Sequence, residues 1–592
     1  MELIQNEWPR ANAENNETLR LRPISKSYKN FNVSVFLPVS NVNQITDLEA
    51  FDKKFEHLYK NVKIGRVYIE CYRSREWAPK EQVMKLKAYF EGKGILTSGA
   101  LTPTGTRTEG RDGDVSLCYS RPEEAILLKQ AVEWNAEMFD EMIFDDFYFL
   151  NCRCPECIKR KGSMTWPEFR KAEKRRVTEE LVMKPAKAVN PNVNVIVKYP
   201  QWFEVFHELG YNLEMESAMF DSIYTGTETR NPLYSMQHLP KYLSYFTQRL
   251  YEAHAPGRNL GGWFDPFECT YSLNSYLEQA YLTLFAKAPE AMLFAMGPMI
   301  DSPDYRLFAP AVGEAFREMD EYLGLLGNPK GVAYYRPNNA RGEDNIHSYF
   351  GMIGFPLEPF TAYPEQEKTI LIAEGAAADP DILARISKSL TGGADVIVTS
   401  NFAKKMGRKF FDLAYMDVTD RKAYINDFTA SREGGQLMGG LVGIFNSKQP
   451  ILMPQIDFAV NDVWELAAGY GTDNNFPIIL RTNYGEGRLA MVTVPDNYGD
   501  LYNYPTPVLD AIRRLSKTTM DVWFEGNSRI QLFAYDNQTF ILRSDNDHSD
   551  RITVHVKPGA KKITELIHGS VYEGDTAEFM IQPGFNYVFK YE

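Results

Sequence analysis

Short hydrophobic runs alternate with amphipathic segments along the first half of the chain. The runs predict strands at 32–39, 65–72, 95–101, 141–147, 193–199, 220–226, 260–267 and 290–297. Intervening segments such as 79–94 and 123–139 carry apolar residues at helical spacing. Eight strand–helix units over this length match a (β/α)₈ TIM barrel, which we expect to occupy residues 1–325 together with an N-terminal extension. A doubly wound parallel sheet is the alternative that this pattern leaves open.

The pattern changes after the predicted barrel. Strand-like runs at 331–337, 368–375 and 394–401 alternate with helical segments such as 380–393, which predicts a smaller open α/β domain over 326–518. From 519 to 592 the residues alternate with period two between turn signals, which predicts a small antiparallel β-sandwich. The fold class is therefore α/β, and a chain of 592 residues is long enough for several domains.

Composition and charge exclude several classes of partner. The net charge of −13 argues against nucleic acid, because phosphate binding needs clustered basic residues. No window approaches the roughly 20 apolar residues that a membrane span needs, and residues 1–20 lack the apolar core of a signal peptide. We therefore expect no membrane partner and a cytoplasmic location.

Three cysteines lie close together just after an acidic pair. Cys152, Cys154 and Cys157 form a C-x-C-x₂-C run that begins six residues after Asp146, and Cys118 lies upstream. Four thiolates can form a tetrahedral zinc site, and clustered thiols in a reducing compartment indicate a metal rather than disulfides. The sequence predicts a structural zinc ion and no organic cofactor. Buried thiols without a metal are the alternative.

Polar residues follow the predicted strands of the barrel, where barrel enzymes place their chemistry. Carboxylates from several strands, beside basic and aromatic side chains, are typical of glycoside hydrolysis, in which one carboxyl protonates the leaving oxygen and a second attacks or activates water. The catalytic candidates are Asp145, Asp146, Asp265 and Glu268, and the substrate-binding candidates are Glu70, Lys198, Tyr199, Tyr224, Glu228, Arg230 and Trp263. Each also has a structural interpretation, as a turn former, an ion-pair partner or a core residue.

The order of barrel, α/β domain and β-sandwich resembles glycoside hydrolase family 42, the β-galactosidases. In that family an Asn-Glu pair ends the fourth strand, the Glu is the acid/base, and a C-x-C-x₂-C run joins an upstream Cys to bind zinc. FDDFYFLNCRCPEC has the same layout. The resemblance implies that Asp146 is the acid, that Cys118, Cys152, Cys154 and Cys157 bind zinc, and that the nucleophile follows the seventh strand, where we favour Glu268 over Asp265.

The acidic pair departs from the family pattern, since Asp145–Asp146 stands where Asn-Glu belongs. We therefore expect a divergent relative that cleaves a terminal sugar from a glycoside or oligosaccharide by a two-carboxylate, retaining mechanism. The alternatives are a non-catalytic carbohydrate-binding protein, an α-glycosidase, or a sugar lyase or phosphorylase on the same barrel.

The predicted α/β domain resembles the amidotransferase-like domain of family 42. Amidotransferase chemistry needs a cysteine nucleophile, and no cysteine occurs between 330 and 592. The resemblance implies that this domain is non-catalytic and that the protein assembles as a homotrimer.

Overall fold

The computed structural model describes residues 27–105, 116–431, 443–471 and 474–592, so the N-terminal extension predicted before residue 27 lies outside the described residues. The chain forms two compact units. The first comprises Met1–Met236, His254–Leu284 and Ala288–Glu321, and the second comprises Gln237–Ala253, Phe285–Lys287 and Tyr322–Glu592. The predicted division into domains at 325 and 518 stays a prediction.

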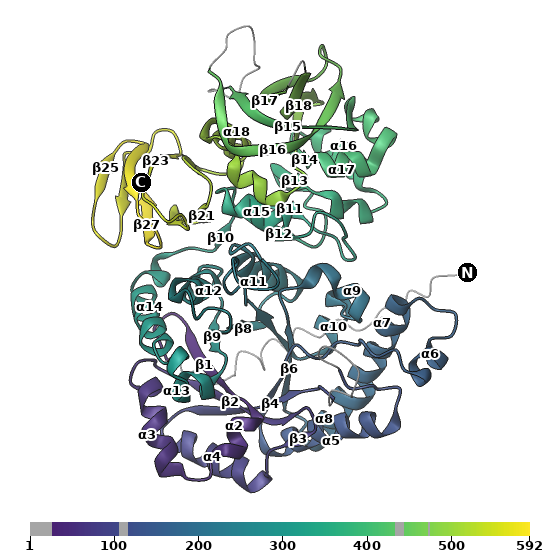
Figure 1. Ribbon diagram of the computed structural model, residues 1–592, viewed down its shortest axis with the longest axis vertical. Coiled ribbons are helices and arrows are strands. Elements are labelled where there is room, and N and C mark those ends of the chain that lie inside the picture. The colour runs from purple at the N-terminus through teal and green to yellow at the C-terminus, as the bar shows by residue number, and fades with distance from the viewer. Residues whose placement is uncertain (1–26, 106–115, 432–442, 472–473) are drawn as a thin grey trace. The chain divides into compact units, whose positions relative to one another are not determined.

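A closed barrel of eight parallel strands forms the first unit, as the sequence predicts (Figure 1). Its strands in order are β1 (Asn32–Leu37), β2 (Arg66–Arg73), β4 (Leu96–Thr102), β5 (Glu141–Phe144), β6 (Asn194–Tyr199), β7 (Ser222–Gly226), β8 (Asn259–Phe264) and β9 (Glu290–Leu293). The barrel closes because β1 pairs in parallel with both β2 and β9. The two-residue strand β3 (Glu76–Trp77) is added antiparallel to β2.

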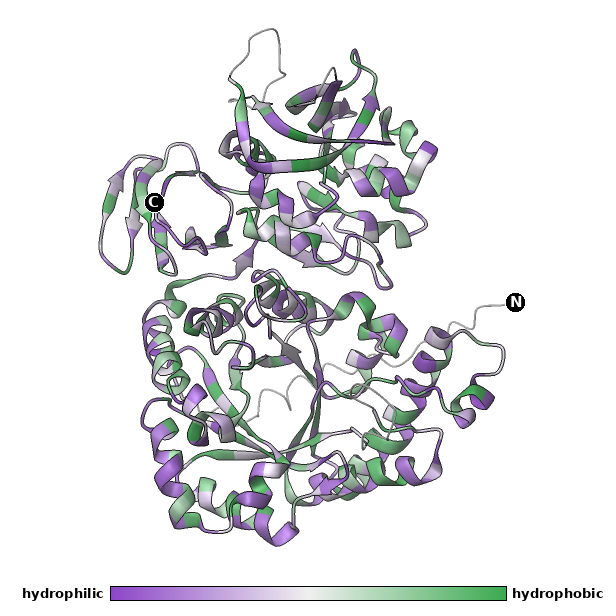
Figure 2. Ribbon diagram, in the orientation of Figure 1, coloured by the Kyte–Doolittle hydropathy of each residue, from purple (hydrophilic) through white to green (hydrophobic). Residues whose placement is uncertain are grey.

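The helices between these strands are amphipathic, and Figure 2 shows mixed hydrophilic and hydrophobic faces around hydrophobic strands. Helix α3 begins where the Asp47 side chain accepts hydrogen bonds from two backbone N–H groups, and it buries Phe51, Phe55 and Leu58. The helices are α2 (Val39–Gln44), α3 (Leu48–Tyr59), α4 (Lys80–Gly92), α5 (Pro122–Met138), α6 (Pro155–Lys161), α7 (Trp166–Val177), the π-helix η1 (Thr178–Met183), α8 (Lys184–Val189), α9 (Phe206–Leu209), α10 (Leu213–Met219), α11 (Leu243–His254), α12 (Leu273–Phe285), α13 (Met296–Asp301) and α14 (Phe308–Tyr322).

The interior of the barrel is built in layers. The middle layer is apolar and receives a residue from every strand: Phe36, Tyr68, Ala100, Ile143, Ile196, Tyr224, Leu260, Trp263 and Met292. Toward the amino ends of the strands lies a polar layer in which Arg66 contacts Ser98 and Glu141. Because side chains alternate along a strand, the positions two residues beyond the apolar layer also point inward. At the carboxyl ends these positions are polar: Glu70, Thr102, Asp145 and Lys198.

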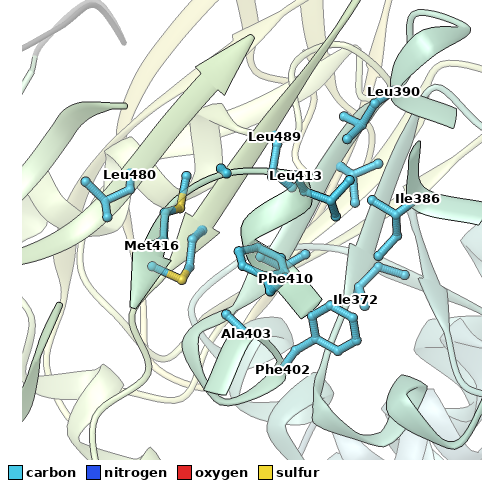
Figure 3. Packing of buried hydrophobic residues seen from close by; sticks show 14 of the residues in the cluster. Ile372, Ile386, Leu390, Phe402, Ala403, Phe410, Leu413, Met416, Leu480 and Leu489 are labelled. Carbon is cyan, nitrogen blue, oxygen red and sulfur yellow. The ribbon is translucent and has the colours of Figure 1, made fainter. Parts of the chain in front are cut away.

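The second unit begins with a nine-stranded sheet. Five parallel strands lie in the order β12 (Leu357–Phe360), β11 (Val332–Tyr335), β13 (Thr369–Ile372), β14 (Asp395–Thr399) and β19 (Gly487–Val492), and the antiparallel strands β18 (Asn474–Tyr484), β17 (Trp464–Gly471), β15 (Met416–Ala430) and β16 (Phe445–Phe458) continue it. The helices are α15 (Ile346–Met352), α16 (Ile382–Thr391), α17 (Ser400–Met406) and α18 (Thr506–Arg514). In the core of this sheet Ile372, Ile386, Phe402 and Leu489 pack together (Figure 3).

The C-terminal part forms two antiparallel sheets, as predicted for a β-sandwich. One has the order β20 (Val522–Glu525), β23 (Asp550–Val556), β26 (Thr576–Ile581), and the other β10 (Pro329–Lys330), β21 (Ile530–Tyr535), β22 (Thr539–Ser544), β27 (Asn586–Tyr591), β24 (Lys562–Glu565), β25 (Val571–Glu573). Among the described residues of the whole chain, none of the helices is both long and apolar enough to cross a membrane.

Candidate active site

A buried lysine joins three carboxylates at the carboxyl end of the barrel. The Lys198 side chain is only 2% exposed. Its Nζ lies 3.0 Å from Asp146 Oδ2, 3.5 Å from Asp145 Oδ1 and 2.5 Å from Glu228 Oε1. The ring of Trp263 lies beneath it, with the ring centroid 4.1 Å from Nζ. Since three acidic groups share one cation, their protons are coupled.

Asp145 is the anchored member of the acidic pair. Its Oδ2 accepts a hydrogen bond of 2.7 Å from Arg73, and its Oδ1 accepts one of 2.8 Å from the backbone N–H of Asp146. Burial alone would raise the pKa of this carboxyl, but Lys198 and Arg73 outweigh burial and hold the pKa below its usual value. Asp145 is therefore an ionised carboxylate whose oxygens are already engaged by the protein.

Asp146 has the opposite character. Burial, together with the negative charges of Asp145 and Glu228, raises the pKa of its carboxyl to about 7, against the opposing effect of Lys198. The side chain is 20% exposed, and its backbone carbonyl accepts a 2.6 Å hydrogen bond from Tyr211. Two adjacent strand residues would point to opposite faces, but β5 ends at Phe144, so both carboxylates reach Lys198.

Arg230, which follows β7, contacts a second pair of carboxylates, Asp265 and Glu268, which follow β8. Its Nε and Nη2 donate to the two oxygens of Asp265 at 3.1 and 2.9 Å, and its Nη1 lies 3.5 Å from Glu268 Oε2. Burial raises the pKa of Asp265, and Arg230 works against that rise. Arg230 and Glu268 both adopt left-handed backbone conformations, with φ of 53° and 59°. Such conformations in non-glycine residues cluster at functional sites.

Two further acidic residues differ in how fully the protein satisfies them. Glu70 accepts hydrogen bonds from the backbone N–H of Val39 and from the side chains of Arg73 and Thr102. Glu228 contacts Lys198 through Oε1, whereas its buried Oε2 has no hydrogen-bond partner within the described residues. Burial raises the pKa of both carboxyls. Glu70 is therefore fixed in the wall of the barrel by its hydrogen bonds, whereas one carboxylate oxygen of Glu228, Oε2, accepts no hydrogen bond from the described residues.

Two aromatic candidates lie away from this cluster. Tyr199 packs its ring against Phe206 and Tyr211, because Lys198 occupies the inward position of β6 and the next residue points outward. Tyr224 points inward but belongs to the apolar layer, where its hydroxyl donates to Glu290 over 3.1 Å. The structure thus brings together the charged candidates and Trp263, and leaves both tyrosines outside the cluster.

A buried ion pair between Lys174 and Glu216 lies next to Tyr211, the residue that donates to the Asp146 carbonyl, and the sequence does not predict it. Lys174 of α7 donates to the backbone carbonyl of Tyr148, lies 3.1 Å from Glu216 Oε1 and lies 4.4 Å from the ring centroid of Tyr211. Burial lowers the pKa of Lys174 to about 8. In the sequence Lys174 belongs to a basic run that is typical of a solvated helix face, and no local signal marks it as the buried member.

The four cysteines converge on one point. Their Sγ atoms all lie within 4.8 Å of one another, and Cys118 Sγ is 3.7 Å from Cys154 Sγ and 3.4 Å from Cys157 Sγ. A tetrahedral zinc site with Zn–S bonds of about 2.3 Å separates its sulfurs by about 3.8 Å. Trp166 and Phe169 of α7 pack against the cluster. These residues therefore fit a four-thiolate metal site, and the same helix carries Lys174.

Comparison with known proteins finds matches for most of the chain. The family described as "Probable glycosyl hydrolase, catalytic domain" matches residues 20–315, which is half of the chain. Residues 322–497 match "Uncharacterized protein SSO3021, second domain", and residues 521–587 match "Probable glycosyl hydrolase, C-terminal domain". The uncharacterized protein SSO3021 of Saccharolobus solfataricus is 25% identical over 614 residues, covering 94% of this chain and 98% of that protein.

Solved structures of glycosidases share the fold. A GH42 β-galactosidase from G. stearothermophilus has a TM-score of 0.62 at 12% identity, covering 96% of this chain and 99% of the other. The α-L-fucosidase isoenzyme 2 from Paenibacillus thiaminolyticus has a TM-score of 0.64 at 11% identity, covering 95% and 99%. The predicted resemblance to family 42 is thereby confirmed at the level of architecture.

Proposed function

Because this chain belongs to the probable glycosyl hydrolase family, we propose that it is a glycosidase that removes a terminal sugar from a glycoside or oligosaccharide, with Asp146 as its general acid. The observation that carries the proposal is the division of labour within the acidic pair. Burial raises the pKa of the Asp146 carboxyl to about 7, while Lys198 and Arg73 keep Asp145 ionised. A carboxyl that holds its proton near neutrality is what the general acid of glycoside hydrolysis requires, and the ionised Asp145 beside it helps to keep that proton in place.

The second catalytic carboxylate in this proposal is Asp265. It directly follows β8, as Asp145 directly follows β5, and it is buried, whereas the Glu268 side chain is 31% exposed. The residue type favours Glu268, whereas burial and the two hydrogen bonds from Arg230 favour Asp265. Burial raises the pKa of Asp265, and Arg230 opposes that rise in favour of the ionised form that a nucleophile needs.

In the proposed retaining reaction, Asp146 protonates the glycosidic oxygen while a carboxylate oxygen of Asp265 attacks the anomeric carbon. The bond to the leaving group breaks, and a covalent glycosyl-enzyme forms. Asp146, now ionised, takes a proton from water, which attacks the same carbon and releases the sugar and Asp265. Lys198 limits the negative charge that accumulates around Asp146 in the second step. Glu228, whose Oε1 contacts Lys198, is the proposed substrate-binding carboxylate beside this acid.

A screen of aryl glycosides tests the proposal. The β-galactosides and α-L-fucosides come first, because proteins with this fold act on those sugars, and α- and β-anomers of other hexoses follow. NMR of the product at early times reports whether the anomeric configuration is retained. Sugar binding in calorimetry without turnover of any substrate would instead identify a carbohydrate-binding protein. An unsaturated product or a sugar phosphate would identify a lyase or a phosphorylase.

Variants assign the roles. Asp146→Asn and Asp265→Asn are each expected to lower kcat by a factor of about 10² or more, since each removes a group used in the transition state. Glu268→Gln is the comparison that decides between the two candidates after β8. Asp140→Asn is the matched control, because Asp140 precedes the same strand β5 at its other end and its side chain accepts a 3.1 Å hydrogen bond from Asn190. Full activity in both Asp146→Asn and Asp265→Asn would end the proposal.

We further propose that Cys118, Cys152, Cys154 and Cys157 hold a structural zinc ion. Their sulfur geometry supports this role, and a bound zinc would fix the loop between β5 and α6. Metal analysis of the purified protein is expected to find about one zinc per chain. A metal-free protein with unchanged thermal stability would contradict it.

A homotrimer is the assembly implied by the resemblance to family 42, and we retain it as a proposal. Light scattering coupled to size-exclusion chromatography measures the mass directly. A monomer of 67.8 kDa would exclude it.

A further inference from the structure

A cavity of about 350 Å³ opens within the second unit. The charged side chains that line it are Asp395, Arg481, Arg488, Arg514 and Lys517. They come from the amino ends of β14 and β19, from β18, and from the end of α18 and the turn after it. Because all of them belong to the second unit, this cavity is a separate feature from the carboxylates of the barrel.

The charge of this lining is opposite to that of the chain. The whole sequence has 65 basic and 78 acidic residues, which gives a net charge of −13. The cavity has four basic side chains and one acidic side chain. A concentration of positive charge on an acidic protein creates a local potential that attracts anions.

One ion pair accounts for only part of this charge. Arg488 Nε lies 2.8 Å from Asp395 Oδ1, and Thr518 Oγ1 donates to Asp395 Oδ2 over 2.6 Å. Asp395 is therefore already engaged by one cation and one hydroxyl. Arg514 lies 3.6 Å from Glu525 Oε1, outside the lining. Arg481 and Lys517 remain, and no acidic residue of the lining forms an ion pair with either of them.

The side chain of Arg481 makes no hydrogen bond or ion pair with any described residue. Its side chain is partly buried, and burial together with the charge of Arg488 lowers its pKa. Arg514 donates to the backbone carbonyl of Ser431 over 3.0 Å, yet its Nε is buried without a hydrogen-bond partner among the described residues. A buried guanidinium N–H without a partner, such as Arg514 Nε, is unfavourable unless an anion or another acceptor satisfies it. The cavity thus holds unused donors suited to an oxyanion.

We propose that this cavity is a binding site for a small phosphate-bearing molecule of about the size of a sugar phosphate. Guanidinium groups bind phosphate oxygens through paired, charge-assisted hydrogen bonds. Arg481 and Arg514 supply these donors and Lys517 supplies a further charge, while Ile397, Ala490 and Leu515 form an apolar wall for the rest of the ligand. The volume lies within the range of small-molecule sites, which begins at about 300 Å³. This site goes beyond the proposed glycosidase activity.

The dipole of α18 is an alternative reason for the basic residues of the cavity, but it explains only some of them. Basic side chains favour the negative end of a helix dipole, which accounts for Arg514 at the end of α18 and Lys517 after it. Arg481 belongs to no helix and lies on β18, the antiparallel strand that pairs with β19. The decisive residue is therefore Arg481.

Calorimetric titration of the full chain with inorganic phosphate tests the site. Saturable binding is expected, and Arg481→Gln is expected to weaken it about tenfold or more, as loss of a hydrogen bond to a charged group does. Arg421→Gln is the matched control, because Arg421 is a basic residue of β15 in the same sheet that pairs with Asp457 over 2.7 Å. Glucose 6-phosphate is expected to bind more tightly than phosphate, and glucose is expected not to bind.

Circular dichroism verifies the fold of each variant. Lys517→Gln, at an exposed position, provides a second test if Arg481→Gln does not fold. The site would be overturned by the absence of saturable heat up to about 10 mM phosphate, which corresponds to an affinity weaker than any useful site. Phosphate binding that survives unchanged in both variants would place the anion elsewhere and overturn the assignment to this cavity.

Discussion

Replacing Lys198 with methionine tests the electrostatic basis of the active site. Methionine fills similar space without charge, so the change removes the cation that Asp145, Asp146 and Glu228 share. Lys198 lowers the pKa of Asp146 in the wild-type protein. Without it the pKa of Asp146 is expected to rise above about 7, and the alkaline limb of the activity profile should move to higher pH.

The size of the shift follows from the 3.0 Å separation between Lys198 Nζ and Asp146 Oδ2. Coulomb's law gives about 1.4 kcal/mol for this pair at the dielectric constant of water and about 5.5 kcal/mol at an effective value of 20. Since 1.36 kcal/mol corresponds to one pKa unit, the rise is expected to lie between about one and four units. Removing one partner from a buried ion pair also costs about 3–5 kcal/mol of stability, so the variant is measured below its unfolding temperature.

The assay is the pH dependence of kcat/KM on an aryl glycoside that the wild-type protein hydrolyses. This profile reports the pKa of the essential acid in the free enzyme. Lys187→Met is the matched control, because Lys187 forms an ion pair of 2.8 Å with Asp221 elsewhere in the barrel. An alkaline limb that stays in place or moves to lower pH in a folded Lys198→Met variant would refute the assignment of Asp146 as the acid.

Three further changes test other parts of the molecule. Cys154→Ser is expected to abolish zinc binding and lower the melting temperature, as metal analysis and calorimetry will show; unchanged values would exclude a structural metal. In Gly226→Ala the new Cβ would lie 2.5 Å from Glu228 Oε2 and 3.0 Å from Pro200 Cα, so we expect a loss of about 1–3 kcal/mol in stability and a raised KM; wild-type kinetics would show that Glu228 does not bind substrate. Lys174→Met is expected to lower the free energy of unfolding by about 3–5 kcal/mol in urea, because it leaves Glu216 buried and unpaired; a variant as stable as wild type would contradict that.

The sequence predicts the architecture well because the strand and helix periods are local properties. The eight barrel strands lie where the hydrophobic runs are, and α4 and α5 begin and end within two residues of the predicted helices. The antiparallel extension of the second sheet was not predicted. Exposed and buried positions are mixed along β15, so its sequence lacks the continuous hydrophobic run that marks the buried parallel strands.

From the sequence, the site could be predicted only for residues that lie at or just after the ends of the barrel strands. Asp145, Lys198 and Asp265 follow or end strands and lie in the cluster, as their position indicates. Tyr199 and Tyr224 also lie near strand ends, but alternation directs the first outward and height within the barrel places the second in the apolar layer. Which residue of a strand points inward depends on pairing across the barrel, and a single strand does not contain that information.

Asp145–Asp146 stands where family 42 has Asn-Glu, and this difference leads to a last prediction. It concerns the pKa of Asp146, which is expected to move in the opposite direction from that in Lys198→Met. An asparagine beside the acid would be neutral, whereas Asp145 adds a negative charge that raises the pKa of Asp146. The departure from the family pattern therefore helps a shorter acid keep its proton. Asp145→Asn preserves the shape and removes the charge, so the pKa of Asp146 should fall and the alkaline limb should move to lower pH, while Lys198→Met moves it to higher pH. The same assay measures both. Shifts in the same direction would show that the two residues do not act on Asp146 through their charge.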